Sequence, residues 1–260
     1  MKTRAKEIAD WMKERVATAG SRGIAVGLSG GIDSAVVIGL AALATPGHVV
    51  GVMMPCHSDP QDEADARVAA DHFGVPAIRI DLAPSYDRMV DDLRATVAQL
   101  PLAQQPASAD DPAALAAKLP VANVKPRLRM TSLYFVANSM NYLVAGTGNR
   151  SELSIGYFTK YGDGGVDLLP IGRLLKSEVR ELARELGVPA PIIEKAPSAG
   201  LWLGQTDEAE MGFSYAELEK YLTAGPSAVL PELAARIESL ERASDHKRAL
   251  APMPPGEPTR

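Results

Sequence analysis

The run Val49–Pro55 constrains the fold most, because it is apolar throughout. A strand without polar alternation is buried on both faces, which is typical of a parallel sheet covered by helices on each side. Ile24–Leu28 is a second apolar run, and a helical pattern separates the two. Strands that alternate with helices predict an α/β fold, in which a doubly wound, Rossmann-like parallel sheet forms a single domain.

The expected elements follow this alternation along the chain. Residues 101–120 break it with Pro, Ala, Gln and Asp, which indicates a surface excursion with one short helix at Ala113–Lys118. Residues 155–172 are glycine-rich and are expected to be irregular. We expect residues 1–250 to form the domain and the Pro-rich residues 251–260 to form a flexible tail. The expected strands are Ile24–Leu28, Val49–Pro55, Ala77–Asp81 and Tyr142–Gly146, and the expected helices are 4–19, Ser34–Ala44, Gln61–Phe73, Tyr86–Gln99, Asn123–Asn141 and Ser177–Leu186.

A glycine loop follows the first strand, with the sequence Leu-Ser-Gly-Gly-Ile-Asp-Ser at residues 28–34. Gly30 and Gly31 let backbone amides approach a ligand where a Cβ would clash, and the next helix offers unpaired N–H groups at its positive end. Such a loop is typical of a polyphosphate site, although it fits neither the Walker pattern nor the dinucleotide fingerprint, and a plain turn is the alternative. Asp33 would repel phosphate unless a divalent cation lay between them. The loop therefore predicts a metal–nucleotide complex.

Composition excludes several other classes of protein. The formal net charge of −5 argues against a nonspecific nucleic-acid surface. The only cysteine, Cys56, excludes a disulfide framework and a multi-cysteine metal site. The charged N-terminus has no signal-peptide core, and no apolar run approaches the roughly 20 residues of a membrane span. We expect a soluble, cytoplasmic protein without nucleic-acid or membrane partners.

The glycine loop resembles the pyrophosphate loop of the N-type ATP pyrophosphatases, whose fold is adenine nucleotide alpha hydrolase-like. Further motifs, in the same order as in the family, resemble NAD synthetases. They are Asn123–Met130, Gly146–Glu152, Gly156–Asp167, Leu169–Ile171 with Lys176, Glu194–Trp202 with Gln205–Glu208, and Asp245–Arg248. Arg173 departs from the family pattern, because many members carry Asp there, and Ser198 stands where relatives often have Thr.

The resemblance implies an activity: ATP-dependent amidation of deamido-NAD to NAD, through an adenylate, with release of AMP and pyrophosphate. It implies Mg²⁺, ATP as co-substrate, and a homodimer whose site spans the interface. Because the glycine loop follows so soon after Met1, we expect no amidase domain before it and ammonia as the nitrogen source. Another pyrophosphatase, such as a tRNA thiolase or a GMP synthetase, or a non-catalytic nucleotide-binding module, is the alternative.

The resemblance also implies roles for individual residues. Asp33, Lys176 and Asp167 are the expected catalytic residues, and Asp33 and Glu152 the expected metal ligands. The expected ATP site contains Gly27, Leu28, Ser29, Gly30, Gly31, Ile32, Asp33, Ser34, Thr147, Lys176 and Ser198. The expected deamido-NAD site contains Arg127, Lys160, Asp167, His246 and Lys247. From the local sequence alone, Glu152 is as readily a helix cap after Asn149 as a ligand. The local sequence favours a solvated helix face for Arg127 and an exposed basic pair for His246 and Lys247.

Overall fold

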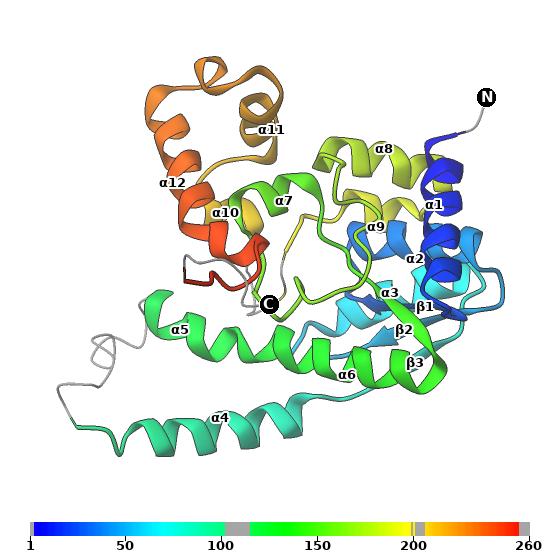
Figure 1. Ribbon diagram of the computed structural model, residues 1–260, viewed down its shortest axis with the longest axis horizontal. Coiled ribbons are helices and arrows are strands. Elements are labelled where there is room, and N and C mark those ends of the chain that lie inside the picture. The colour runs from blue at the N-terminus through cyan, green and yellow to red at the C-terminus, as the bar shows by residue number, and fades with distance from the viewer. Residues whose placement is uncertain (1–2, 102–114, 199, 201–205, 255–260) are drawn as a thin grey trace.

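The computed structural model describes residues 3–101, 115–198, 200 and 206–254. Its centre is a parallel sheet in the strand order β3-β2-β1-β4 (Figure 1). Ile24 on β1 lies opposite Val49 on one neighbouring strand and Leu143 on the other. This arrangement confirms the predicted parallel sheet. The strands are β1 (Gly23–Leu28), β2 (Val49–Met53), β3 (Ala77–Arg79) and β4 (Tyr142–Ala145).

Each strand sends alternate side chains to opposite faces of the sheet, and helices cover both faces. Ile24 and Val26 pack with one group of helices, whereas Ala25 between them packs with the other group. If a strand slipped by one residue, the side chains that face one group of helices would face the other group. The two cores therefore fix the pairing register of the strands. The first group is α1 (Arg4–Thr18), α2 (Ile32–Ala44), α3 (Pro60–His72), α8 (Lys176–Leu186) and α9 (Ala190–Glu194); the second is α4 (Ala83–Val97) and α6 (Val124–Met140) (Figure 1).

A third core lies away from the sheet, in a region to which the sequence pattern assigned no element. It joins Ile155 at the end of α7 to apolar residues of the last helices, such as Leu218 and Ile237. Figure 1 shows these helices beside α7, apart from the strands. The region consists of α7 (Arg150–Ile155), α10 (Asp207–Met211), α11 (Tyr215–Ala224), the short 3₁₀ helix η2 (Pro226–Ala228) and α12 (Pro231–Arg248).

Element boundaries differ from the expected ones where local chemistry decides them. α2 begins at Ile32 rather than Ser34, because extended Gly31 is its N-cap and Asp33 already lies in its first turn. α4 begins at Ala83 rather than Tyr86, and a proline occupies its first turn, where its missing N–H costs nothing. The surface excursion expected at residues 101–120 overlaps α5 (Leu115–Ala122), a helix that runs through Pro120. The start of the expected helix, residues 113–114, lies outside the described residues.

The C-terminal end after α12 has no regular structure over residues 251–254, and these residues are exposed. The rest of the expected tail lies outside the described residues. Within the described part of the chain, none of the helices combines the length and the apolar character that a transmembrane helix needs.

Candidate active site

A cavity of about 460 Å³ opens where the central strands end. Its walls include Leu28 and Met53 at the ends of β1 and β2, and Gly146 directly after β4. The chain passes from β1 outward through β2 to β3 and returns to the other side of β1 with β4. In such sheets, ligands bind beyond the carboxyl ends of the strands at the point where the order reverses. The cavity occupies this position between β1 and β4.

The glycine loop forms the floor of this cavity and leads into the positive end of α2. Gly30 has a φ of +78°, and a Cβ there would lie 2.2 Å from the carbonyl oxygen of Asp62 on α3. Only glycine fits this conformation and this close approach. The Gly31 N–H donates to Ser29 Oγ at 3.2 Å, and Ser34 Oγ donates to the Gly31 carbonyl at 2.9 Å. The loop therefore holds its shape by its own hydrogen bonds and presents a helix N-terminus, where anions bind readily.

Beside the loop, Asp33, Glu152 and Lys176 form one charged cluster. Lys176 is 1% exposed, and its Nζ contacts a carboxylate oxygen of Asp33 and lies 3.3 Å from Glu152 Oε1. Burial opposes the charge of Lys176, but the two carboxylates outweigh it and raise its pKa. Burial also raises the pKa of Glu152 to about 7, against the attraction of Lys176. The structure thus brings together three site residues that the sequence scatters over three elements.

Glu152 combines the two roles that the local sequence leaves open. Its Oε2 accepts from the Asn149 N–H at 3.2 Å while the Glu152 N–H donates to Asn149 Oδ1 at 3.1 Å, which is a capping box at the start of α7. Its other oxygen, Oε1, faces Lys176. Asn149 is fully buried, and its Nδ2 donates to Asp33 Oδ1 at 3.0 Å. The cap of α7 therefore also fixes the two carboxylates relative to each other.

A further acidic group, Asp207, lies on the wall of the cavity, and the sequence assigned it no role. It is buried at the start of α10, and its Oδ2 accepts from the Tyr215 hydroxyl at 2.8 Å. Burial raises the pKa of Asp207, and Lys176 acts in the opposite direction. The motif Gln205–Glu208 was the available signal. It could not show that Asp207 reaches Lys176, because that depends on how the third core packs.

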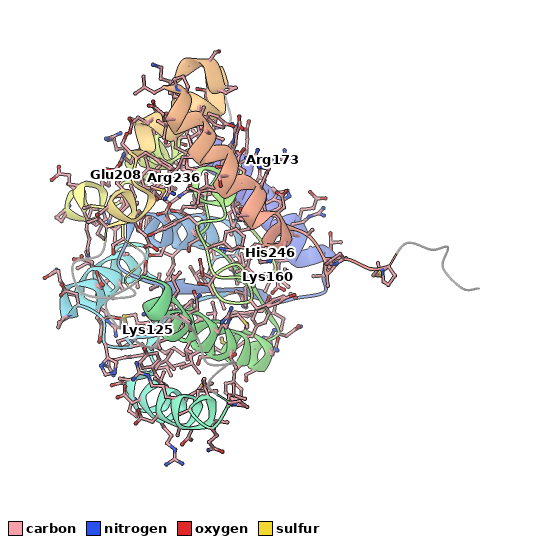
Figure 2. The ribbon with its side chains drawn as sticks, turned by 90° about the vertical axis from the view of Figure 1, so that its left-hand side faces the viewer. Lys125, Lys160, Arg173, Glu208, Arg236 and His246 are labelled. Carbon is pink, nitrogen blue, oxygen red and sulfur yellow. The ribbon has the colours of Figure 1, made fainter. Side chains whose placement is uncertain are left out.

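Of the residues expected to bind deamido-NAD, only Lys247 lines the cavity, and Arg127, Lys160 and His246 lie close to one another outside its lining. Lys160 Nζ donates to the His246 carbonyl, and Figure 2 shows the two residues where the end of α12 meets the loop after α7. Arg127 Nε, on α6, approaches the Lys160 carbonyl at 3.4 Å. Lys247 lines the cavity and donates to the carbonyls of Gly156 at 2.7 Å and Phe158 at 2.8 Å. These contacts bring together α6, the loop after α7 and the end of α12, which are far apart in the sequence.

Asp167, expected to be catalytic and to bind substrate, has protein partners for both carboxylate oxygens. Oδ1 accepts from the Tyr134 hydroxyl at 2.9 Å and Oδ2 from the Val144 N–H at 2.8 Å. Asp167 is exposed and does not line the cavity. Through these two hydrogen bonds, Asp167 connects β4 to α6. Of the residues expected to bind ATP, Gly27, Leu28, Ser29, Gly31, Ile32, Asp33, Thr147, Lys176 and Ser198 line the cavity, and Gly30 and Ser34 lie behind it.

Arg129 is a cavity residue that the sequence placed only within a motif. Its Nε donates to the Met54 carbonyl at 3.1 Å and its Nη2 to Ser58 Oγ at 3.2 Å. Arg129 therefore ties α6 to the end of β2. Burial lowers its pKa from the ordinary value, but an arginine remains charged at any physiological pH. Arg129 therefore adds a positive charge to the lining of the cavity, beside Lys176, Lys195 and Lys247.

A parallel sheet with a glycine loop where the strand order reverses is typical of α/β proteins that bind nucleotides. The sequence profile of the NAD synthase family matches residues 4–251. The chain belongs to the NAD synthase family.

Individual relatives agree with this assignment. The chain is 48% identical to the NH₃-dependent NAD⁺ synthetase of Carboxydothermus hydrogenoformans over 249 residues, which is 96% of each chain. Among solved structures, it is similar to the NMN synthetase of Francisella tularensis, with a TM-score of 0.85, 34% identity and coverage of 96% of this chain and 97% of that one. The NH₃-dependent NAD synthetase of Campylobacter jejuni gives a TM-score of 0.75 with 26% identity over 96% and 97% of the two chains.

Proposed function

We propose that this protein is an ammonia-dependent NAD synthetase, which amidates deamido-NAD at the expense of ATP. The observation that carries the proposal is the cluster of Asp33, Glu152 and Lys176 beside the glycine loop, at the strand ends of a chain similar to named NH₃-dependent NAD⁺ synthetases. The purified protein should convert deamido-NAD, MgATP and ammonium into NAD, AMP and pyrophosphate. Release of ADP instead of AMP would contradict the proposal.

The reaction consists of two transfers. An oxygen of the nicotinate carboxylate attacks the α phosphorus of ATP, and the bond to the bridging oxygen breaks as pyrophosphate leaves. Ammonia then attacks the carbonyl carbon of the mixed anhydride, AMP leaves, and one proton is lost. The carboxylate is a poor electrophile until AMP supplies a good leaving group. Because the substrate itself is the nucleophile in the first step, no covalent enzyme intermediate is required.

The residues at the loop suit the polyphosphate. The Gly31 N–H and the hydroxyls of Ser29 and Ser34 now bond within the loop and can exchange these partners for phosphate oxygens. Lys176 lies close enough to the loop residue Asp33 to offset charge on departing pyrophosphate. We assign Thr147 and Ser198 to the ATP side of the cavity, which both of them line.

Asp33 and Glu152 fit a magnesium ion. Both are carboxylates, the hard ligands that Mg²⁺ prefers, and both approach the same ammonium group. No group of three or more potential ligands in the described parts of the chain forms a metal site by itself. Mg²⁺ usually takes one or two carboxylates and completes its shell with substrate phosphates and water, so this pair of carboxylates suits it. When bound, the ion would neutralise phosphate charge.

Arg127, Lys160, His246 and Lys247 suit the anionic substrate, which carries a diphosphate and a carboxylate. A guanidinium binds such groups through two parallel hydrogen bonds. We keep Asp167 in this set as a residue that supports the Lys160 loop, in view of its bonds to Tyr134 and Val144.

The nitrogen source distinguishes ammonia-dependent enzymes from glutamine-dependent ones. We expect NAD formation with ammonium and none with glutamine that has been freed of ammonium. The assay should measure NAD under both conditions with the same protein preparation. Equal rates with the two nitrogen sources would overturn this part of the proposal.

A second candidate function is amidation of the mononucleotide, to give NMN. The observation in its favour is the similarity to the NMN synthetase of Francisella tularensis, at a TM-score of 0.85. The chemistry is the same, and only the adenylate half of the substrate is missing. Comparing kcat/KM for deamido-NAD and for nicotinate mononucleotide decides between the two, and a larger value for the mononucleotide would favour the second candidate.

We also propose that the protein is a homodimer in the cytoplasm. A row of large apolar side chains on α4, Met89, Leu93, Val97, is exposed, as is Phe135 on α6. Exposed apolar side chains in such numbers on neighbouring helices are typical of an interface, and a second copy of the chain is the occupant we propose. The cytoplasm supplies the ATP that the reaction consumes.

A further inference from the structure

Lys195 joins two walls of the cavity and has no role in the reaction described so far. It directly follows α9, and its Nζ lies 2.8 Å from Asp62 Oδ1 and also contacts the carboxylate of Asp65. Both aspartates lie in the first half of α3. The Lys195 side chain is 29% exposed, so the ion pairs are only partly screened by water. The two carboxylates raise the pKa of Lys195 although burial opposes its charge.

The partners of Lys195 reach the glycine loop. The main chain of Asp62 packs against Gly30 so closely that a Cβ on Gly30 would lie 2.2 Å from the Asp62 carbonyl oxygen. Any shift of this part of α3 therefore acts on the loop that we assign to the phosphates. Asp62 itself lines the cavity together with Lys195.

The residues directly after Lys195 reach the opposite wall. Pro197 accepts a hydrogen bond from the Asp207 N–H at 3.1 Å, and Ser198 lines the cavity. Ser198 is exposed, and among the described residues its Oγ accepts a hydrogen bond from the nearby Gly200 N–H at 3.1 Å. Lys195 is thus the charged link between the Ser198 segment and α3.

We infer that Lys195 is a positioning residue for ATP, which holds the Ser198 segment against the phosphate loop through its ion pairs with Asp62 and Asp65. The inference rests on the proposed function, because it takes the cavity to be the ATP site. Lys195 acts through its neighbours, since both aspartates occupy its ammonium group. A lysine that bound the phosphates directly would have to break these pairs first.

Three variants test the link: Lys195→Met, the double variant Asp62→Asn with Asp65→Asn, and Lys195→Arg. MgATP affinity is measured by calorimetric titration, and KM for deamido-NAD by steady-state assay. We expect Lys195→Met and the double variant each to weaken MgATP binding on the order of ten-fold, the size of a lost charge-assisted contact. Combining them should add little, because they break the same link. Lys195→Arg should recover most of the affinity, and KM for deamido-NAD should change much less.

The double variant is decisive. Removing two negative charges beside a phosphate site would by itself favour ATP, so a loss of affinity identifies the link. Unchanged or tighter MgATP binding in the double variant would overturn the inference, as a lysine released to bind phosphate directly would behave that way. Urea unfolding of each variant excludes global loss of structure, and Asp71→Asn, at an exposed position near the end of α3, is the matched control. If the unaltered protein fails to bind MgATP, the proposed function fails instead.

Discussion

At the scale of single residues, Asp33 is the side chain on which the loop, the cap of α7 and Lys176 converge. We expect Asp33→Asn to lower kcat at least about 100-fold, because an amide is a much weaker ligand for a hard dication and a poorer partner for an ammonium group. The measurement is AMP release at saturating substrates over a range of Mg²⁺ concentrations. Asp92→Asn, in an exposed pair with Arg88, is the control. Near-normal activity of Asp33→Asn with the usual Mg²⁺ dependence would reduce Asp33 to a turn residue.

Glu152 makes the stability of the fold depend on pH. Its pKa is raised by burial from 4.5 to about 7, so the folded state favours its protonated form. The contribution of protonated Glu152 to the free energy of unfolding is fully present below about pH 4.5 and is lost as the pH rises through about 7. We therefore expect Glu152→Gln to unfold at a higher urea concentration than the unaltered protein at pH 8, and at the same concentration at pH 4. The comparison is made in EDTA. A difference that does not depend on pH would contradict the raised pKa.

Arg127 tests whether deamido-NAD binds near the Lys160 loop, outside the lining of the cavity. Loss of one charge-assisted contact costs about 1.5–3 kcal/mol, so Arg127→Ala should weaken deamido-NAD binding on the order of 10- to 150-fold. MgATP binding should change little, because Arg127 lies at the Lys160 loop and not at the glycine loop. Calorimetric titration of both ligands measures this, with Arg88→Ala as an exposed control. Equal weakening of both ligands would refute the assignment.

The sequence pointed to many of the residues that line the cavity but not to their arrangement. The glycine pattern pointed to the loop, and Asp33 to a cation. The meeting of Asp33, Glu152 and Lys176 depends on contacts across more than a hundred residues, which no local pattern contains. Asp207 and Arg129 could not have been assigned for the same reason. The position of Asp167 beside β4, with both oxygens bonded, is also visible only in three dimensions.

At the scale of elements, the end of α12 holds both the end of α7 and the loop that follows it. Lys247 donates to two carbonyls of this loop, and Arg248 Nη1 donates to the carbonyls of Leu153 at 3.0 Å and Ser154 at 3.1 Å. We expect Arg248→Ala to speed amide hydrogen exchange in residues 153–160 without ligand, and to leave α2 unchanged. Arg242→Ala, whose side chain is 71% exposed, is the control on the same helix. Unchanged exchange in residues 153–160 would show that α12 does not support the loop.

The sheet and most of the helices that cover it were predictable, because apolar runs alternate with helical segments along the chain. The short helix α9 (Ala190–Glu194) was not expected. The last helices were not predicted, although Ser214 and Glu217 form a capping box that marks the start of α11. These helices pack on α7 rather than on the sheet, so the alternation of strands and helices says nothing about them.

At the scale of the whole molecule, the exposed apolar side chains of α4 and α6 predict self-association. Phe135 is 75% exposed. We expect the unaltered protein to sediment as a dimer and Phe135→Asp to sediment as a monomer at micromolar concentration, because a charge cannot be buried there without a partner. Ala64→Asp, at an exposed position of α3 on the other side of the sheet, is a control for added charge. If Phe135→Asp is still a dimer, the interface lies elsewhere.

Glu152 both caps α7 and faces the cavity, so selection for folding and selection for activity should tolerate different substitutions at this position. In a library of every substitution at position 152, scored only for the abundance of folded protein, glutamine should survive, because it can complete the same capping box. Scored for growth that depends on the product, glutamine should be lost together with nearly all other residues. The gap between the two scores at this position would separate what evolution keeps for folding from what it keeps for chemistry.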